Sequence, residues 1–320
     1  EWDSPNAEDI RPTEFSFSNY GDAVKRIDDY ADLATKMAML MSALPDSLKN
    51  PVYETIGYPV MASNSMNRKF LFAQLNNEYA QAGSKDKANY AAFISKSSAE
   101  DLDSLTNIYN NLENGKWNGI MAIPPGFCAK YQNMPPLICY KDDASKAVWL
   151  TYDTVRPACR TLNLKEAMID ERSRNAGTRL IDGFGYDGFV LRLGNPTDEI
   201  SGETIPEAIL NLNDLKGDSV TLQIFHLPYF PLHEGKGCKI GVTVDDQEEQ
   251  VVEYLPEEWS KPWKENILRN SALSKTTFRI DPDKTSHTLR LRGIDPGMAI
   301  QRIVIDEGGF KPGYVGYDLE

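Results

Sequence analysis

The acidic side chains are the first candidates for chemistry, because hydrolysis of a glycosidic bond needs two carboxyl groups about 5 to 9.5 Å apart. They are densest at three places: Asp170-Glu171, Asp182 with Asp187, and Asp245-Asp246. Asp245-Asp246 lies between two alternating apolar runs, where such residues usually form a hairpin turn. Asp182 and Asp187 bound a glycine-rich stretch, whose spacing is not that of an EF-hand calcium loop. The sequence identifies no catalytic residue and no metal ligand among these acids.

The chain has three histidines, His226, His233 and His287, and their spacing is not that of a zinc site. His287 precedes an alternating run, which predicts a hydrogen-bonded residue at the edge or surface of a sheet. The sequence also lacks a G-x-S-x-G nucleophile elbow, a phosphate-binding loop and a dinucleotide fingerprint. We therefore expect no metal, no cofactor, and neither nucleophilic nor nucleotide chemistry.

The four cysteines, Cys128, Cys139, Cys159 and Cys238, show no C-x-x-C spacing. They are too few and too scattered for a disulfide framework in a chain of 320 residues. We expect buried free thiols. A single disulfide between Cys128 and Cys139 stays open, and it would fit a periplasmic location.

Aromatic side chains offer the remaining route to ligand binding, because the C–H face of a pyranose packs against an indole or phenol ring. Trp259 and Trp263 are four residues apart, so one helical turn would place both rings on one face as a sugar platform. The alternative is that they cap one end of a hydrophobic core. Tyr229, Phe230 and Tyr314 lie in loops rich in Pro or Gly and are weaker candidates.

The charge of the chain argues against polyanionic partners. There are 34 Lys and Arg against 47 Asp and Glu, a formal net charge of −13 at pH 7, and no basic stripe offsets it. Nucleic acid and anionic membrane surfaces are therefore not expected as partners. No run approaches the roughly 20 apolar residues needed to span a bilayer, so membrane insertion is not expected either. The start at Glu1 has no Met and no signal-peptide core, which fits a processed periplasmic or secreted protein or a fragment.

Helical periodicity dominates the first third of the chain. Apolar residues spaced three and four apart predict a helix that Asn19 caps and Pro45 ends. A second helix is predicted over residues 46–81, with a kink or break near Pro59. A third covers residues 85–112, and its predicted apolar side consists of Tyr90, Phe93, Ile94, Leu102, Leu105, Ile108, Tyr109 and Leu112.

The third predicted helix ends at Asn114-Gly115, which favours a left-handed C-terminal cap. Three helices with short connections predict an antiparallel bundle. Later in the chain the pattern alternates between apolar and polar residues, as in half-buried strands, at 220–224, 240–244, 276–280 and 287–291. The predicted organisation is a leader (1–18), a helical bundle (19–123), a linker (124–147), an antiparallel jelly-roll-like β-sandwich (148–312) and a tail (313–320).

Three motifs carry a resemblance to a known family. They are Tyr58-Pro59-Val60-Met61-Ala62 followed by Met66-Asn67, then Gly115-Lys116-Trp117-Asn118, and finally Gly293 to Asp306 continued by Gly308-Gly309-Phe310-Lys311-Pro312. In order and spacing they resemble the helical domain and C-terminal β-sandwich domain of glycoside hydrolase family 115, the xylan α-1,2-glucuronidases. The last motif is the most specific, because Pro296-Gly297 predicts a turn, Ile300, Ile303 and Ile305 predict a strand, and Gly308-Gly309 allow unusual backbone angles.

The resemblance implies a galactose-binding-like sandwich and covers only the rear half of the family's architecture. The catalytic barrel of that family precedes the helical domain, and nothing in this sequence resembles it. Residues 119–127 also replace the polar groups that follow the Lys-Trp-Asn motif in the family. The implied function is a non-catalytic accessory region of a glucuronoxylan-degrading glycoside hydrolase. Support, homodimer formation and binding of xylan-type oligosaccharides are the expected roles.

Two other functions stay open at this point. The first is an active α-glucuronidase that releases glucuronic acid from xylan with two carboxylates that the sequence does not reveal. The second is a pure assembly module without affinity for sugars.

Overall fold

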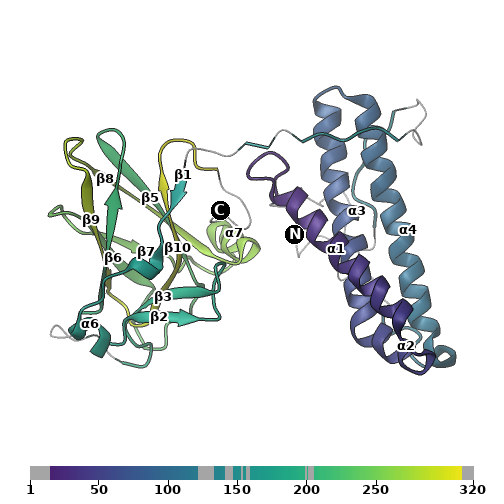
Figure 1. Ribbon diagram of the computed structural model, residues 1–320, viewed down its shortest axis with the longest axis horizontal. Coiled ribbons are helices and arrows are strands. Elements are labelled where there is room, and N and C mark those ends of the chain that lie inside the picture. The colour runs from purple at the N-terminus through teal and green to yellow at the C-terminus, as the bar shows by residue number, and fades with distance from the viewer. Residues whose placement is uncertain are drawn as a thin grey trace. The chain divides into compact units, whose positions relative to one another are not determined.

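The computed structural model divides into two compact units, Glu1–Val155 and Arg156–Glu320 (Figure 1). It describes residues 15–121, 133–140, 147–152, 154–155, 159–198, 200 and 205–311, except the side chain of Leu268. Several positions singled out above lie outside the described residues, namely Cys128, Tyr314, most of the linker, residues 122–127 of the divergent loop, and the tail.

The first unit is the predicted helical bundle. Its elements are α1 (Asp22–Ala43), α2 (Asp46–Val52), the π-helix η2 (Tyr53–Gly57), α3 (Tyr58–Gln81) and α4 (Lys85–Gly115). Figure 1 shows α1, α3 and α4 side by side, with α3 packed against both of the others. The irregularity predicted near Pro59 is present as a π-helical turn, which ends at Gly57 and continues directly into α3, whose first turn contains Pro59.

The predicted N-terminal cap of α1 is wrong. The capping position is Gly21, whose φ of 69° is in the left-handed region, and no side chain caps the helix. Asn19 instead forms an isolated bridge with Val155. At the far end of α4, Glu113, Asn114 and Gly115 all have positive φ, so the left-handed ending is confirmed and begins one residue earlier than predicted.

The buried side of α4 agrees with the predicted one in the second half of the helix, where Tyr109 and Leu112 are buried, and differs from it in the first half. Small residues fill it where the helix faces α3: Ala88, Ala91, Ala92, Ser95 and Ser98 are all buried. Phe93, which we placed on the apolar side, is 44% exposed. Small side chains let the two helix axes approach closely, and the hydroxyl of Ser95 donates to the carbonyl of Lys69 across the gap at 2.6 Å.

Two extended segments return to the bundle and belong to it. The amide of the fully buried Asn76 binds both the N–H and the carbonyl of Ile138, at 2.9 and 2.8 Å. The hydroxyl of Tyr79 donates to the carbonyl of Thr151 at 2.8 Å. These bonds explain why residues 147–155, which we divided between the linker and the sandwich, lie in the helical unit.

The second unit is an antiparallel β-sandwich, as predicted. One sheet has the order β2-β3-β10-β5-β8, with β1 also paired to β10, and contains β1 (Cys159–Thr161), β2 (Arg179–Asp182), β3 (Phe189–Leu193), β5 (Ser219–His226), β8 (Ala272–Arg279) and β10 (Met298–Asp306). The other contains β4 (Glu207–Asn213), β9 (Ser286–Gly293), β6 (Lys239–Val244) and β7 (Gln250–Glu253), in that order. The four alternating runs of the sequence correspond to β5, β6, β8 and β9.

Strand β10 contains a bulge that explains its sequence. Ile300 pairs with His226 and Arg302 pairs with Phe225, so Gln301 is an extra residue. The bulge reverses the alternation and lets Ile300 and Ile303 both point into the core despite their odd spacing.

The outer face of the six-stranded sheet is also covered. Phe225, Arg302 and Val304 point away from the core, yet each is at most 2% exposed. Tyr186 lies edge-on to Phe225, and its hydroxyl donates to the carbonyl of Arg269, at the end of α7 (Lys261–Arg269), at 2.6 Å. The loop between β2 and β3 therefore ties α7 to this sheet as a third layer. Two short helical turns, η3 (Leu164–Glu166) and α6 (Glu171–Asn175), complete the unit.

Candidate functional site

The tryptophan pair lies at the start of α7. Ser260 caps this helix, because its hydroxyl accepts from the N–H of Trp263 at 3.3 Å, and Pro262 occupies its first turn. Trp259 therefore precedes the helix, and the expected single helical turn does not join the two residues. A φ of 67° at Trp259 turns the chain back instead, and the ring centroids come within 5.0 Å at an interplanar angle of 43°.

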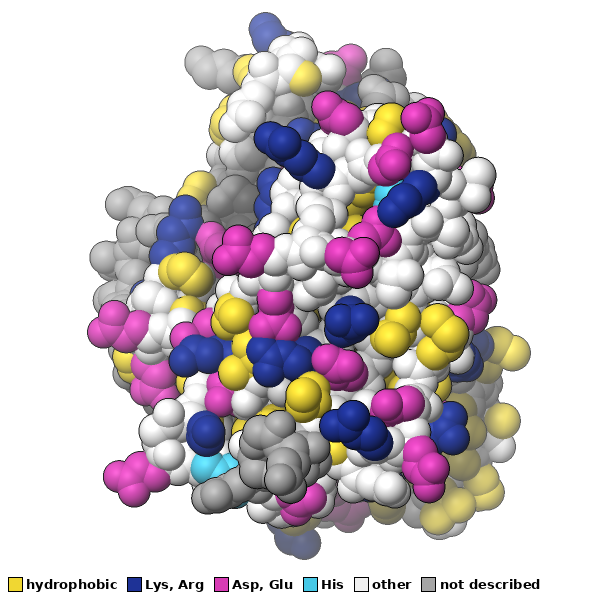
Figure 2. Space-filling model, turned by 90° about the vertical axis from the view of Figure 1, so that its left-hand side faces the viewer, with side chains coloured by type: hydrophobic (Ala, Val, Ile, Leu, Met, Phe, Trp, Pro, Cys, Tyr) yellow, Lys and Arg dark blue, Asp and Glu magenta, His cyan; other side chains and the backbone are white. Residues whose placement is uncertain are grey.

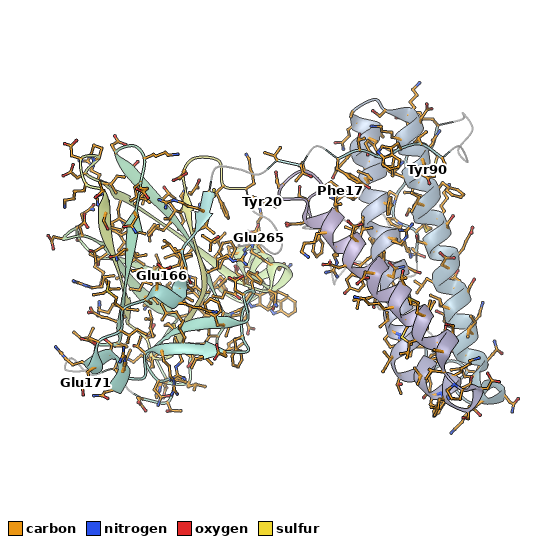
Figure 3. All side chains as sticks on the ribbon, in the orientation of Figure 1. Phe17, Tyr20, Tyr90, Glu166, Glu171 and Glu265 are labelled. Carbon is orange, nitrogen blue, oxygen red and sulfur yellow. The ribbon has the colours of Figure 1, made fainter. Side chains whose placement is uncertain are left out.

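The two rings are available to a ligand. Trp259 is 62% exposed and Trp263 is partly exposed, so Trp259 does not cap the core. Lys261 and Glu265 form an ion pair of 3.8 Å on the same helix, and Figure 3 labels Glu265 there. An exposed aromatic surface beside polar side chains is the arrangement that binds the C–H face of a sugar and its hydroxyls.

Tyr229 and Phe230 lie on a different loop, between β5 and β6, and they differ in exposure. Phe230 is 68% exposed, whereas Tyr229 packs against the sandwich core and accepts a hydrogen bond at its carbonyl from the thiol of Cys238. Burial raises the pKa of Tyr229. Tyr229 thus anchors the loop, and of these two residues only Phe230 presents its ring to solvent.

The three acidic clusters take part in the fold. Asp170 caps α6, and hydrogen bonds from Ser173 lower the pKa of its carboxyl. Asp187 forms a two-bond ion pair with the buried guanidinium of Arg302. Asp245 forms the expected turn after β6, and its carboxylate accepts from the N–H of Thr288 at 2.9 Å.

The histidines are structural as well. His287 is buried and its Nδ1 lies 2.8 Å from the Asp245 carboxylate, so the expected edge or surface position is wrong. It faces the core because Leu289 and Leu291, which alternate with it, do so too. His226 is fully buried, stacks on Tyr254 at 3.9 Å, and lies 2.6 Å from the hydroxyl of Ser274.

The thiols agree only in part with the expectation. Cys139, Cys159 and Cys238 are thiols outside any disulfide, but only Cys238 is buried, and burial raises its pKa to about 12. Cys139 is exposed, with the Lys96 ammonium 3.6 Å away.

Across the described residues, no cluster of three or more His, Cys, Asp or Glu has the arrangement of a metal site. None of the described helices combines the length and apolar character of a membrane span. The face shown in Figure 2 carries acidic and basic side chains side by side, with no large area of one sign.

Known proteins share this architecture. The family model of the glycosyl hydrolase family 115 C-terminal domain matches residues 211–318. The solved structure of BtGH115A, a family GH115 4-O-methyl-α-glucuronidase with specificity for decorated arabinogalactans, matches 90% of this chain with a TM-score of 0.69 and 27% identity. This chain spans 33% of that chain.

A second solved structure, the GH26-CBM35 β-(1,4)-mannanase of Podospora anserina, has a TM-score of 0.23 and 7% identity, over 46% of this chain and 29% of that one. Values this low support no argument about fold. No curated protein matches the chain.

The helical unit and the two-sheet sandwich together resemble one part of a family 115 glycoside hydrolase. The chain is thus a partial GH115-like piece, and the resemblance indicated by its three motifs is confirmed.

Proposed function

We propose that this chain is a non-catalytic accessory region of a glucuronoxylan-degrading glycoside hydrolase, and that its sandwich binds carbohydrate through Trp259 and Trp263. The observation that carries the proposal is the exposed tryptophan pair, with ring centroids 5.0 Å apart. Two large rings beside each other cover an area suited to a pyranose face, and they lose little conformational freedom on binding, since Ser260 and Pro262 hold the start of α7.

The non-catalytic part of the proposal is supported by the acidic side chains. Asp170, Asp187 and Asp245 are each engaged in a cap, an ion pair or a turn. A catalytic carboxyl pair must face a cleft that admits a sugar. If the chain alone released glucuronic acid from glucuronoxylan, this part of the proposal would be wrong and the α-glucuronidase alternative would stand.

Calorimetric titration tests the platform. We expect weak binding of xylo-oligosaccharides, aldouronic acids or arabinogalactan fragments, the last included because BtGH115A has specificity for decorated arabinogalactans. Trp259→Ala should abolish the heat of binding of neutral xylo-oligosaccharides. Trp149→Ala is the matched control, since Trp149 is 86% exposed in the helical unit. If the wild-type chain gives no heat with any of the three ligands, the binding role is wrong and an assembly role gains.

Homodimer formation is the third part of the proposal. Helix α1 leaves Leu33, Met39 and Leu40 between 46% and 66% exposed, and its Asp32 pairs with Lys36, so the apolar residues lie on a locally neutral surface. Light scattering should then give a molar mass twice that of the chain. Leu40→Lys should lower the measured mass to that of a single chain. A wild-type monomer would exclude this part without affecting the sugar platform.

A further inference from the structure

Arg26, on α1, is held in a fixed position by three side chains. Its guanidinium carbon lies 4.4 Å from the ring centroid of Phe15 and 4.9 Å from that of Tyr30. Its Nε donates to Oδ1 of Asn67, on α3, at 2.6 Å. The plane of the guanidinium is therefore set by two aromatic rings and one hydrogen bond, which is more restraint than a solvated arginine has.

The two terminal nitrogens of this guanidinium, Nη1 and Nη2, donate no hydrogen bond to a described residue. Arg26 is only partly buried, and among the described residues no group accepts from Nη1 or Nη2 and no carboxylate forms an ion pair with it. These two nitrogens carry four of the five N–H groups of arginine, in the planar fork that matches a carboxylate. A guanidinium that is already oriented loses little entropy when such an anion binds.

The facing side of α3 supplies further polar groups. Asn64, Asn67 and Arg68 are three and four residues apart, so they share one side of the helix, and the bond to Asn67 turns that side toward Arg26. Oδ1 of Asn64 is buried and has no hydrogen-bond partner among the described residues. Arg68 lies 5.2 Å from the ring centroid of Phe72 and forms no ion pair with a described residue.

Acidic side chains of α1 also lie in this neighbourhood. Burial raises the pKa of Tyr152, Asp28 raises it further, and Arg68 lowers it, so both charges lie near that ring. Tyr152 stacks on Phe17, beside the first turn of α1 (Figure 3). Asp28 is exposed and pairs with neither arginine, and Asp29 pairs with Lys25 at 3.0 Å. Asp22, four residues before Arg26, also lies on this side of α1.

We propose that Arg26 binds the carboxylate of a uronic acid residue through Nη1 and Nη2, with Arg68 beside it. The geometry of Arg26 supports a carboxylate, and the choice of a uronate rests on the carbohydrate role proposed above. The site lies in the helical unit, whereas the tryptophan platform lies in the sandwich.

Ligand-observed NMR on the full chain tests the site with sodium glucuronate, glucose and acetate. Glucuronate should bind, whereas glucose, which has the same ring without the carboxylate, and acetate, which is a carboxylate without the ring, should bind at least tenfold more weakly. Arg26→Lys keeps the charge but loses the fork, and it should weaken glucuronate binding at least tenfold. Arg279→Lys, at an exposed position of β8, is the matched control and should leave glucuronate binding unchanged.

Two outcomes would overturn the site: equal binding of glucuronate and glucose or acetate, and full affinity in Arg26→Lys. If Arg26→Lys lowers the melting temperature, Arg68→Lys is used as the test variant in its place. We expect it to weaken glucuronate binding by a smaller factor than Arg26→Lys. The platform can fail while this site stands, because xylo-oligosaccharide binding depends on Trp259 and glucuronate binding on Arg26.

Discussion

Asp187 and Arg302 form an ion pair across 115 positions of the sequence, on the outer face of the six-stranded sheet. Both oxygens of the carboxylate accept from the guanidinium, one of them at 3.1 Å from Nε, and Arg302 is 2% exposed. Tyr186 lies against the same guanidinium, 5.3 Å from its carbon to the ring centroid. The pair thus joins the loop between β2 and β3 to the central strand β10.

Removing one partner of this pair should be costly. Asp187→Ala leaves a buried charge without its counter-ion, for which we expect a loss of about 3 to 5 kcal/mol in the free energy of unfolding. The double variant Asp187→Leu with Arg302→Met should lose less than Asp187→Ala alone. Urea unfolding measures both. Asp32→Ala is the control, because its pair with Lys36 is exposed, and a change within about 0.5 kcal/mol is expected there.

His226 should make the protein sensitive to acid. Burial lowers its pKa to about 3, from 6.5 in an unfolded chain. Between these values the unfolded state binds a proton that the folded state excludes, so stability falls as the pH decreases from about 6.5 toward 3, by at most about 1.4 kcal/mol per pH unit.

His226→Gln should flatten this dependence, although its stability at pH 8 is lower. Chemical unfolding at a series of pH values measures the slope. His233→Gln, at a partly exposed position, serves as the control and should keep the wild-type slope. An unchanged slope in His226→Gln would contradict the assignment.

The contact between α3 and α4 should not tolerate larger side chains. Ala91 is fully buried, so Ala91→Leu inserts three carbon atoms into a filled contact and should cost about 1 to 3 kcal/mol. Phe93→Ala should change the stability by no more than about 0.5 kcal/mol, since that ring is 44% exposed. Thermal unfolding of the two variants distinguishes the observed buried side of α4 from the one that hydrophobicity predicts.

Gly297 is expected to be irreplaceable in the turn before β10. Its φ is +79°, and a Cβ there would lie 2.6 Å from Cβ of Pro196. Gly217 has a similar φ of +86° but open space around it. Gly217→Ala should therefore lower the free energy of unfolding by about 1 kcal/mol, the cost of holding an alanine in the left-handed region. Gly297→Ala should lower it clearly more, because its Cβ also meets Pro196. Equal melting temperatures for the two variants would show that the close approach to Pro196 does not affect stability.

Local patterns predicted the elements well where each pattern has one physical cause. The alternating runs became β5, β6, β8 and β9 because the side chains of a strand alternate between its two faces. Pro59 marked the π-helical turn before α3 because a proline lacks the N–H that a regular helix interior needs. Asn19 failed as a cap because Gly21, two residues later, adopts the left-handed backbone instead.

The candidate site was predictable only in its residue types. Two tryptophans four residues apart predicted rings that lie side by side. The predicted helical turn between them was wrong, because the left-handed backbone of Trp259 brings the rings together. The roles of Asp187 and His287 were missed, because their partners Arg302 and Asp245 are far away in sequence. Arg26 gave no signal in the sequence, since its bond to Asn67 forms only when α1 packs on α3.

By itself the sequence determined the order of the elements, the two-part organisation and the resemblance of the chain to part of a glycoside hydrolase, because these depend on neighbouring residues and local motifs. Only the tertiary structure decided which side of α4 is buried, which aromatic rings face solvent and which charges are paired. These properties depend on side chains brought together from distant positions, and no local spacing encodes them.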